Sequence, residues 1–146
     1  MTSKLVASHR ERAEIYHEAS LCKQKTQVLL HQFHLPKGLM PLNHLNEFGY
    51  NKTTWFLWLK QEKTFKYLFK ELGLTSYGVE ITAFIGDRQL KKLTGVKSKE
   101  MMIWITLFDV FVDDTKGRSK IYCSNSMGQS KSYPVTTVED EPKELK

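Results

Sequence analysis

The chain has 146 residues and a formal net charge of +6, and hydrophobic residues make up 40% of it. This length suits one domain with a sizeable core, and the composition is typical of a globular protein rather than a disordered one. No apolar run reaches the roughly 18–20 residues of a membrane span, and residues 1–19 lack the apolar segment of a signal peptide. The sequence therefore argues against a membrane-spanning helix and predicts a cytoplasmic protein.

Residues 3–33 are predicted to form a helix. Apolar residues recur at mixed spacings of three and four, which is typical of one helical face packed on a core. Pro36 disfavours helical conformation in the residue before it, so we expect the helix to end near residues 34–35. Residues 1–34 are thus interpreted as an N-terminal helix packed on the domain.

The stretch 34-HLPKGLMP-41 that follows is interpreted as a corner of the chain. Pro36 fixes φ, and Gly38 allows a conformation that a side chain would forbid. Four apolar residues can anchor the corner in the core, namely Leu35, Leu39, Met40 and Leu42. An alternative is a place on the rim of a concave site, with Lys37 beside its mouth.

Short segments beyond residue 47 are predicted to be β-strands separated by turn residues. A helix over 62–72 is an alternative for one of them, because Glu71-Leu72-Gly73 resembles a helix end. Regularly spaced short strands predict a mostly β single domain, an antiparallel β-barrel or barrel-like sandwich over residues 35–138, with a loose charged tail at 139–146. The candidate strands are 55–60, 64–70, 79–85, a segment around Leu90 and Leu93, 101–112, 119–124 and 132–138.

Positive charge is concentrated in residues 52–99, which hold ten Lys or Arg and four acidic residues. Such a segment could meet phosphates, anionic lipid or nucleic acid, although lysines also keep exposed strands soluble. Nucleic acid is not expected, because strand alternation buries the aromatic rings that would stack on bases. The candidate ligand-binding residues are Lys37, Lys91, Lys92, Lys97 and Lys99, and the candidate pocket or core aromatics are Trp55, Trp58 and Trp104.

Motifs for catalysis or metal binding are weak. The chain has no G-x-S-x-G elbow, no H-E-x-x-H motif and no glycine-rich phosphate loop after a strand. Cys22 and Cys123 are expected to be reduced core thiols. His31, His34 and His44 could approach one another, but no Cys pair accompanies them. We therefore assign no catalytic residue, metal or cofactor, and we leave enzymatic activity open while favouring a binding role.

Several of these stretches together resemble one plant family, catalogued as domain of unknown function 538. They are 34-HLPKGLMP-41, Glu47-Phe-Gly-Tyr50, and 91-KKLTGVK-97 followed by Trp104, and the resemblance runs from about Val28 to Val138. It implies a mostly β, barrel-like domain with an N-terminal helix. For function it offers only a likeness to lipid-binding defence proteins, hydrolysis of chlorophyll-type esters, and roles in stress responses and epidermal hair development. No catalytic set comes with these motifs.

The sequence thus favours a non-catalytic binding module for an apolar or anionic amphipathic ligand such as a lipid. A barrel mouth covered by the helix is a plausible pocket, with lysines of 88–99 near the head group, and peripheral contact with an anionic membrane is a related expectation. An ester hydrolase, by analogy alone, and a protein-interaction module in stress or developmental signalling are alternatives. Bulky side chains can fill a small barrel, so the sequence leaves open whether the interior is hollow, as it does the oligomeric state.

Overall fold

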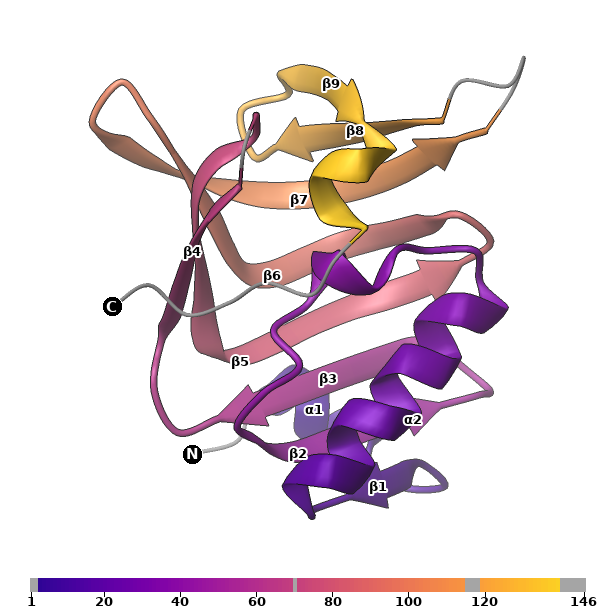
Figure 1. The fold of residues 1–146 in the computed structure, drawn as a ribbon. Helices are drawn as coiled ribbons and strands as arrows, with labels where there is room; N and C mark the ends of the chain where they lie inside the picture. The colour runs from indigo at the N-terminus through magenta and orange to yellow at the C-terminus, as the bar shows by residue number, and fades with distance from the viewer. Residues whose placement is uncertain (1–2, 70, 115–118, 140–146) are drawn as a thin grey trace.

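One antiparallel sheet organises the chain, as the computed structural model shows over residues 3–69, 71–114 and 119–139 (Figure 1). The strands follow the order β1-β2-β3-β5-β6-β7-β8-β9, and β4 pairs with β5 beside this path. The sheet is not closed, so the mostly β, antiparallel, barrel-like single domain is confirmed in an open form. The strands are β1 (Glu14–Tyr16), β2 (Leu45–Asn51), β3 (Phe56–Gln61), β4 (Phe65–Phe69), β5 (Gly73–Gly86), β6 (Gln89–Glu100), β7 (Ile103–Asp113), β8 (Lys120–Asn125) and β9 (Ser130–Pro134).

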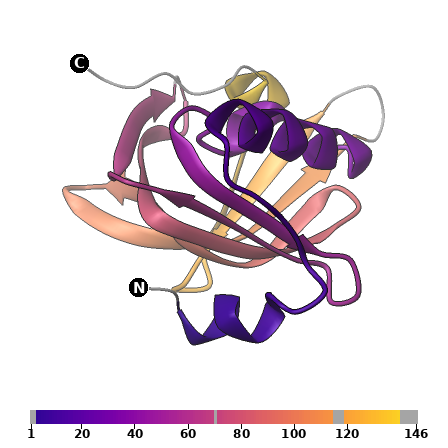
Figure 2. The same cartoon turned by 90° about the horizontal axis from the view of Figure 1, so that it is seen from below.

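The sheet bends because its two longest strands, β5 and β6, pair irregularly. Their register shifts between Tyr77 and Phe84. Gly95 lies opposite this region with φ +81°, and a Cβ there would be 2.2 Å from the carbonyl oxygen of Glu80. Such irregularities bend strands and increase their twist. We call the face inside the bend the inner face and the opposite one the outer face (Figure 2).

The inner face carries the main core, covered by α2 (Ala19–Gln32) and by two 3₁₀ helices, η1 (Lys37–Leu39) and η3 (Val135–Val138). Helix α2 packs on β2, and η1 packs on η3. No helix in the described part of the chain has the length and apolar character needed to cross a membrane. Cys22 and Cys123 are both buried free thiols, as expected.

The outer face carries α1 (Lys4–His9), whose Val6 is buried with Phe56 and Trp58 in a second apolar cluster. The prediction of one helix over 3–33 is therefore wrong in its middle, because β1 separates α1 from α2 and pairs with β2. Tertiary contacts explain the difference. Arg10 donates a hydrogen bond to the carboxylate of Glu47, and the pairing of β1 with β2 replaces the hydrogen bonds of a helix. The proposed boundaries at 34 and 138 stay a prediction.

The corner at 34–42 agrees with the interpretation from its sequence. Pro36 precedes η1 in an extended conformation, and the side chains of Leu35, Met40 and Leu42 are buried. The expectation for Gly38 is wrong: it lies buried within η1, and the left-handed residue is His34, with φ 59°.

Two further segments differ from or refine the expected strands. Residues 62–72 contain strand β4 rather than a helix, with Phe65 and Phe69 buried as the alternation predicts. The strand expected at 132–138 ends at Pro134 and continues as η3. The tail is described only at Glu139, so the expectation for 140–146 lies outside the described residues, as does most of the turn at 113–117.

Close packing on the outer face yields a stability prediction. A Cβ at Gly49 would lie 2.1 Å from Cζ2 of the buried Trp58 ring. We expect Gly49→Ala to lower the free energy of unfolding by about 3 kcal/mol, because the ring must be displaced from a packed site. Urea denaturation of the variant measures this loss.

Gly128→Ala is the matched control. Gly128 has φ +82°, and a Cβ added there would meet no atom within 4 Å, so only backbone strain of about 1 kcal/mol is expected. Equal losses for the two variants would contradict the packing explanation for Gly49.

Candidate functional site

The interior of the bent sheet is filled by side chains. Between the inner face and η3 there remains a narrow apolar cavity, in which about 20 Å³ is open to the centre of a water-sized sphere. That is room for about one water molecule, and an acyl chain does not fit in it. Burial raises the pKa of Tyr77, and it raises the pKa of the Cys123 thiol to about 12. Cys123 is therefore protonated and unsuited to nucleophilic attack.

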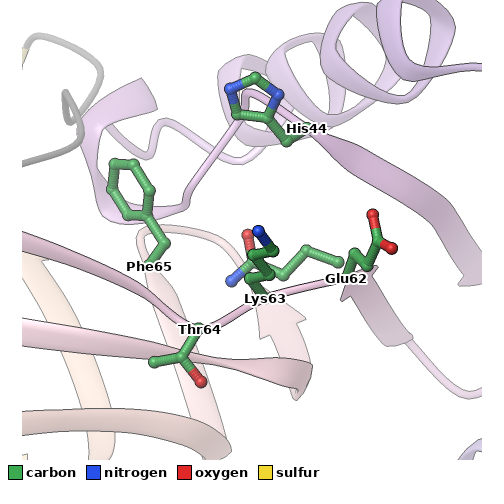
Figure 3. Close-up of a pocket in the computed structure, with 6 residues that line it drawn as sticks. His44, Glu62, Lys63, Thr64 and Phe65 are labelled. Atoms are coloured by element: carbon green, nitrogen blue, oxygen red, sulfur yellow. The ribbon is translucent and has the colours of Figure 1, made fainter.

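A surface hollow of about 290 Å³ lies beside the β3–β4 connection (Figure 3). His44 lies across it from the segment Glu62–Phe65. The side-chain amide of Gln61 donates to the backbone carbonyls of Tyr77 and Gly78, so it is already committed to the fold. The remaining polar side chains are exposed, and the hollow offers no desolvated group that would grip a ligand.

A second hollow of about 290 Å³ gathers residue types that hydrolases use, including His31, His34, Asp114 and Ser119. Their hydrogen bonds do not form a catalytic relay. His34 Nδ1 contacts Asp87 Oδ1 at 2.7 Å, and the Ser119 hydroxyl donates directly to Asp114. In the usual catalytic relay a histidine lies between the serine and the carboxylate, and no histidine is bonded to Ser119 among the described residues. Within those residues there is also no group of three or more potential metal ligands.

The most strongly perturbed carboxylate among the described residues is Glu47, which lies on the outer face of β2. Burial alone would raise its pKa, but hydrogen bonds from Arg10 and Trp58, with the nearby charge of Lys60, lower it to about 2. The Arg10 guanidinium donates through both terminal nitrogens, at 2.8 and 3.3 Å, and the indole N–H of Trp58 donates at 2.7 Å. With its oxygens engaged by the fold, this carboxylate acts as an anchor rather than as a catalyst.

The predicted lysines fall into three separate places. Lys37 lies on η1, with the other inner-face elements. Lys91 and Lys92 lie near the start of β6, where the ammonium of Lys92 is 5.7 Å from the ring centre of Phe84. Lys97 and Lys99 lie toward the other end of β6. The five candidates therefore do not form one site, and the structure brings only the last two together with a predicted tryptophan.

The three tryptophans also separate. Trp58 is fully buried, as expected. Trp55, a predicted pocket or core residue, is 52% exposed, because it lies in the β2–β3 turn with φ 66°, where its ring packs edge-on against Phe33. Trp104 is 36% exposed on β7, opposite Lys99. The core interpretation is therefore wrong for Trp55 and Trp104.

The β6–β7 hairpin carries the most exposed apolar group of the described residues. Its two-residue turn is Met101-Met102, which are 94% and 83% exposed, and Ile103 is 63% exposed. Both methionines have positive φ, 48° and 71°. A two-residue turn with positive φ at both positions favours Asn-Gly. Met101 and Met102 therefore adopt a backbone conformation that is unfavourable for residues with large side chains.

Cations surround the base of this tip. The ammonium groups of Lys66 and Lys99 lie 5.5 and 5.7 Å from the ring centre of Trp104. The acidic residue next to the turn, Glu100, is paired with Lys131 at 2.5 Å. We call the group Lys66, Lys97, Lys99 and Met101–Trp104 the hairpin end.

Sequence reasoning misses Lys66 and the methionines of the hairpin end. It treats residues 101–112 as one apolar strand, because methionine is not a turn-forming residue and the turn at Met101-Met102 carries no local signal. The proximity of Lys66 follows from β4 pairing with β5, which no local pattern reveals.

A comparison with known protein families places this chain in one of them. The family model described as "Protein of unknown function, DUF538" matches residues 26–139. The chain belongs to this family. No curated protein and no solved structure matches the chain significantly. Two of the DUF538-like stretches have structural explanations here, since Glu47 and Gly49 accommodate Trp58, and Gly95 permits the bend of the sheet.

The Glu47 anchor predicts a pH dependence. Its folded pKa of about 2 is below the usual 4.5, so the ionised form stabilises the fold above about pH 4.5, and this contribution is lost as the pH falls toward 2. A shift of this size corresponds to about 3 kcal/mol. We expect Glu47→Gln to lose about that much stability at pH 7, measured by urea denaturation, and the difference from wild type to shrink steadily below pH 4.5.

Glu62→Gln, at an exposed carboxylate, is the control and should leave stability nearly unchanged. A wild-type advantage over Glu47→Gln that stays constant from pH 7 to pH 2 would show that the ionisation of Glu47 is not its source.

Proposed function

We propose that the protein is a non-catalytic binding module for anionic amphipathic lipids, which it contacts at the hairpin end. The observation that carries the proposal is the exposed ring of Trp104 beside the ammonium groups of Lys66 and Lys99, next to a protruding apolar turn. An anionic amphipath needs both features, a cationic contact for its head group and apolar contact for its chain.

The filled interior favours surface binding over enclosure. A cavity of about 20 Å³ cannot hold an acyl chain, and the lysines of β6 alternate with the buried Leu90, Leu93 and Val96, so they lie away from that cavity. A lipid that meets these lysines would therefore meet them outside the core. Binding at this surface replaces the pocket in a barrel mouth that the sequence suggested. The anionic head group is still the part of the lipid that the lysines contact.

Electrostatics sets the expected strength and its salt dependence. Lys66 and Lys97 are exposed and Lys99 is partly so, and each lysine near an anionic lipid surface contributes about 1 kcal/mol. The charge of the whole chain, +6, acts in the same direction. Binding should therefore weaken as salt screens these charges.

Co-sedimentation with vesicles tests the proposal. The wild-type protein should bind phosphatidylcholine vesicles that contain phosphatidylserine, and should bind pure phosphatidylcholine much less. Replacing Lys97 and Lys99 together by Gln should weaken the anionic binding roughly 30-fold, from about 1 kcal/mol for each lysine.

The matched control replaces Lys37 and Lys91 by Gln, which removes the same charge from the same protein at positions outside the hairpin end. This pair should retain most of the binding. Equal loss in both pairs would show that net charge, and not this site, recognises the lipid. A wild-type protein that binds neither the anionic vesicles nor a soluble short-chain phosphatidylserine at low salt would overturn the proposed function.

A further inference from the structure

The apolar side chains at the hairpin end project outward rather than lining a groove. Met101, Met102 and Ile103 are among the most exposed apolar residues of the described chain, and they sit at the tip of a hairpin (Figure 1). A tip of this shape cannot enclose a single lipid molecule. It can enter a soft apolar layer, where its exposed surface is removed from water.

The hairpin is built to hold this tip in place. Four consecutive cross-strand pairs, from Lys97–Thr106 to Glu100–Ile103, continue up to the turn. The two methionines keep positive φ in a turn that favours Asn and Gly. A supported hairpin of this kind presents its apolar tip without first having to order it on binding.

Two neighbouring turns bring further apolar residues to the same end of the sheet. The β8–β9 turn is joined to β7 by a hydrogen bond from Ser126 N to Thr106 O of 2.9 Å, and it exposes Met127. Strand β4 leads toward the β4–β5 turn and exposes Leu68. By strand register, Leu68 and the β8–β9 turn lie toward the same end of the strands as the hairpin tip, which projects at the upper left of Figure 1.

The charges are arranged for an anionic surface. Lys97 and Lys99 precede the turn on β6, Lys66 of β4 lies beside the Trp104 ring, and Glu100 is neutralised by its pairing with Lys131. Trp104 lies at the level of these cations, directly opposite Lys99 on the neighbouring strand. Tryptophan at this level, with lysines beside it, is the arrangement found where proteins meet the head-group region of a bilayer.

We infer that the hairpin end is a membrane-docking surface, which inserts Met101, Met102 and Ile103 into the interface of an anionic bilayer while Lys66, Lys97 and Lys99 contact its phosphates. This inference rests on the proposed function and names its partner as the bilayer rather than single lipid molecules. Single-stranded nucleic acid is the competing occupant, since Phe108 and Phe111 are also exposed on β7.

The test compares vesicles with a soluble lipid. In the variant Met101→Ser/Met102→Ser, binding to phosphatidylserine-containing vesicles should fall about tenfold or more, because apolar burial is lost. Its binding to dihexanoyl phosphatidylserine below the micellar concentration should match wild type. In wild type, brominated lipids in the vesicles should quench the fluorescence of Trp104, measured against Trp104→Phe to subtract the other two tryptophans.

The control variant Val28→Ser/Val79→Ser removes two apolar side chains that are exposed elsewhere, on α2 and β5, and it should bind vesicles like wild type. Circular dichroism shows that each variant is folded before its binding is compared.

The outcomes separate the two proposals. If the methionine variant binds vesicles like wild type while Lys97→Gln/Lys99→Gln does not, the docking inference is wrong and the lipid-binding function stands. If neither vesicles nor the soluble lipid bind to wild type, both are wrong. Binding of poly(U), lost in Phe108→Ala/Phe111→Ala, without binding of vesicles would overturn the inference in favour of nucleic acid.

Discussion

The ionised carboxylate of Glu47 is the interaction on which the arrangement of the outer face depends. It lies on β2, accepts the indole N–H of Trp58 from β3, and pairs with Arg10 from the N-terminal segment. Three segments therefore meet at one buried charge. Removing one partner would leave the others desolvated without compensation, which is why such groups are expensive to disturb. Gly49 completes the arrangement, since the Trp58 ring occupies the space of its missing side chain.

The contacts of Glu47 hold the N-terminal segment over one part of the outer face and leave the other part uncovered. The segment from α1 to β1 covers β2 and β3, whereas the outer side of β7 leaves Trp104, Phe108 and Phe111 exposed. The inner face is covered by α2, η1 and η3 and is filled. The exposed aromatic side chains of this face therefore lie on the surface of β7.

The sequence predicts best what depends on local alternation. The burial of Phe65 and Phe69 on the inner side of β4 follows directly from the alternation of apolar and polar residues along the strand. Sequence reasoning fails where distant contacts decide: Arg10 leaves the helical pattern to reach a carboxylate 37 positions away. It also fails where apolar residues are exposed, because hydrophobicity alone cannot distinguish a buried strand from Met101 and Met102 at a turn. Of the candidate site, Lys97, Lys99 and Trp104 are predicted from the sequence, whereas Lys66 requires the pairing of β4 with β5.

The open sheet has a consequence for self-association. An unclosed sheet leaves strand edges whose free backbone groups can pair with another molecule and start aggregation. Here the edge strands are poor templates. Strand β1 has three residues, and β9 has five, carries Lys131 and ends at Pro134, which has no N–H to donate. Strand β4, beside the main path, is also short and exposes Lys66. The fold thus gains a barrel-like enclosure without sealing its edges, and it relies on short, charged borders to keep neighbouring molecules from extending the sheet.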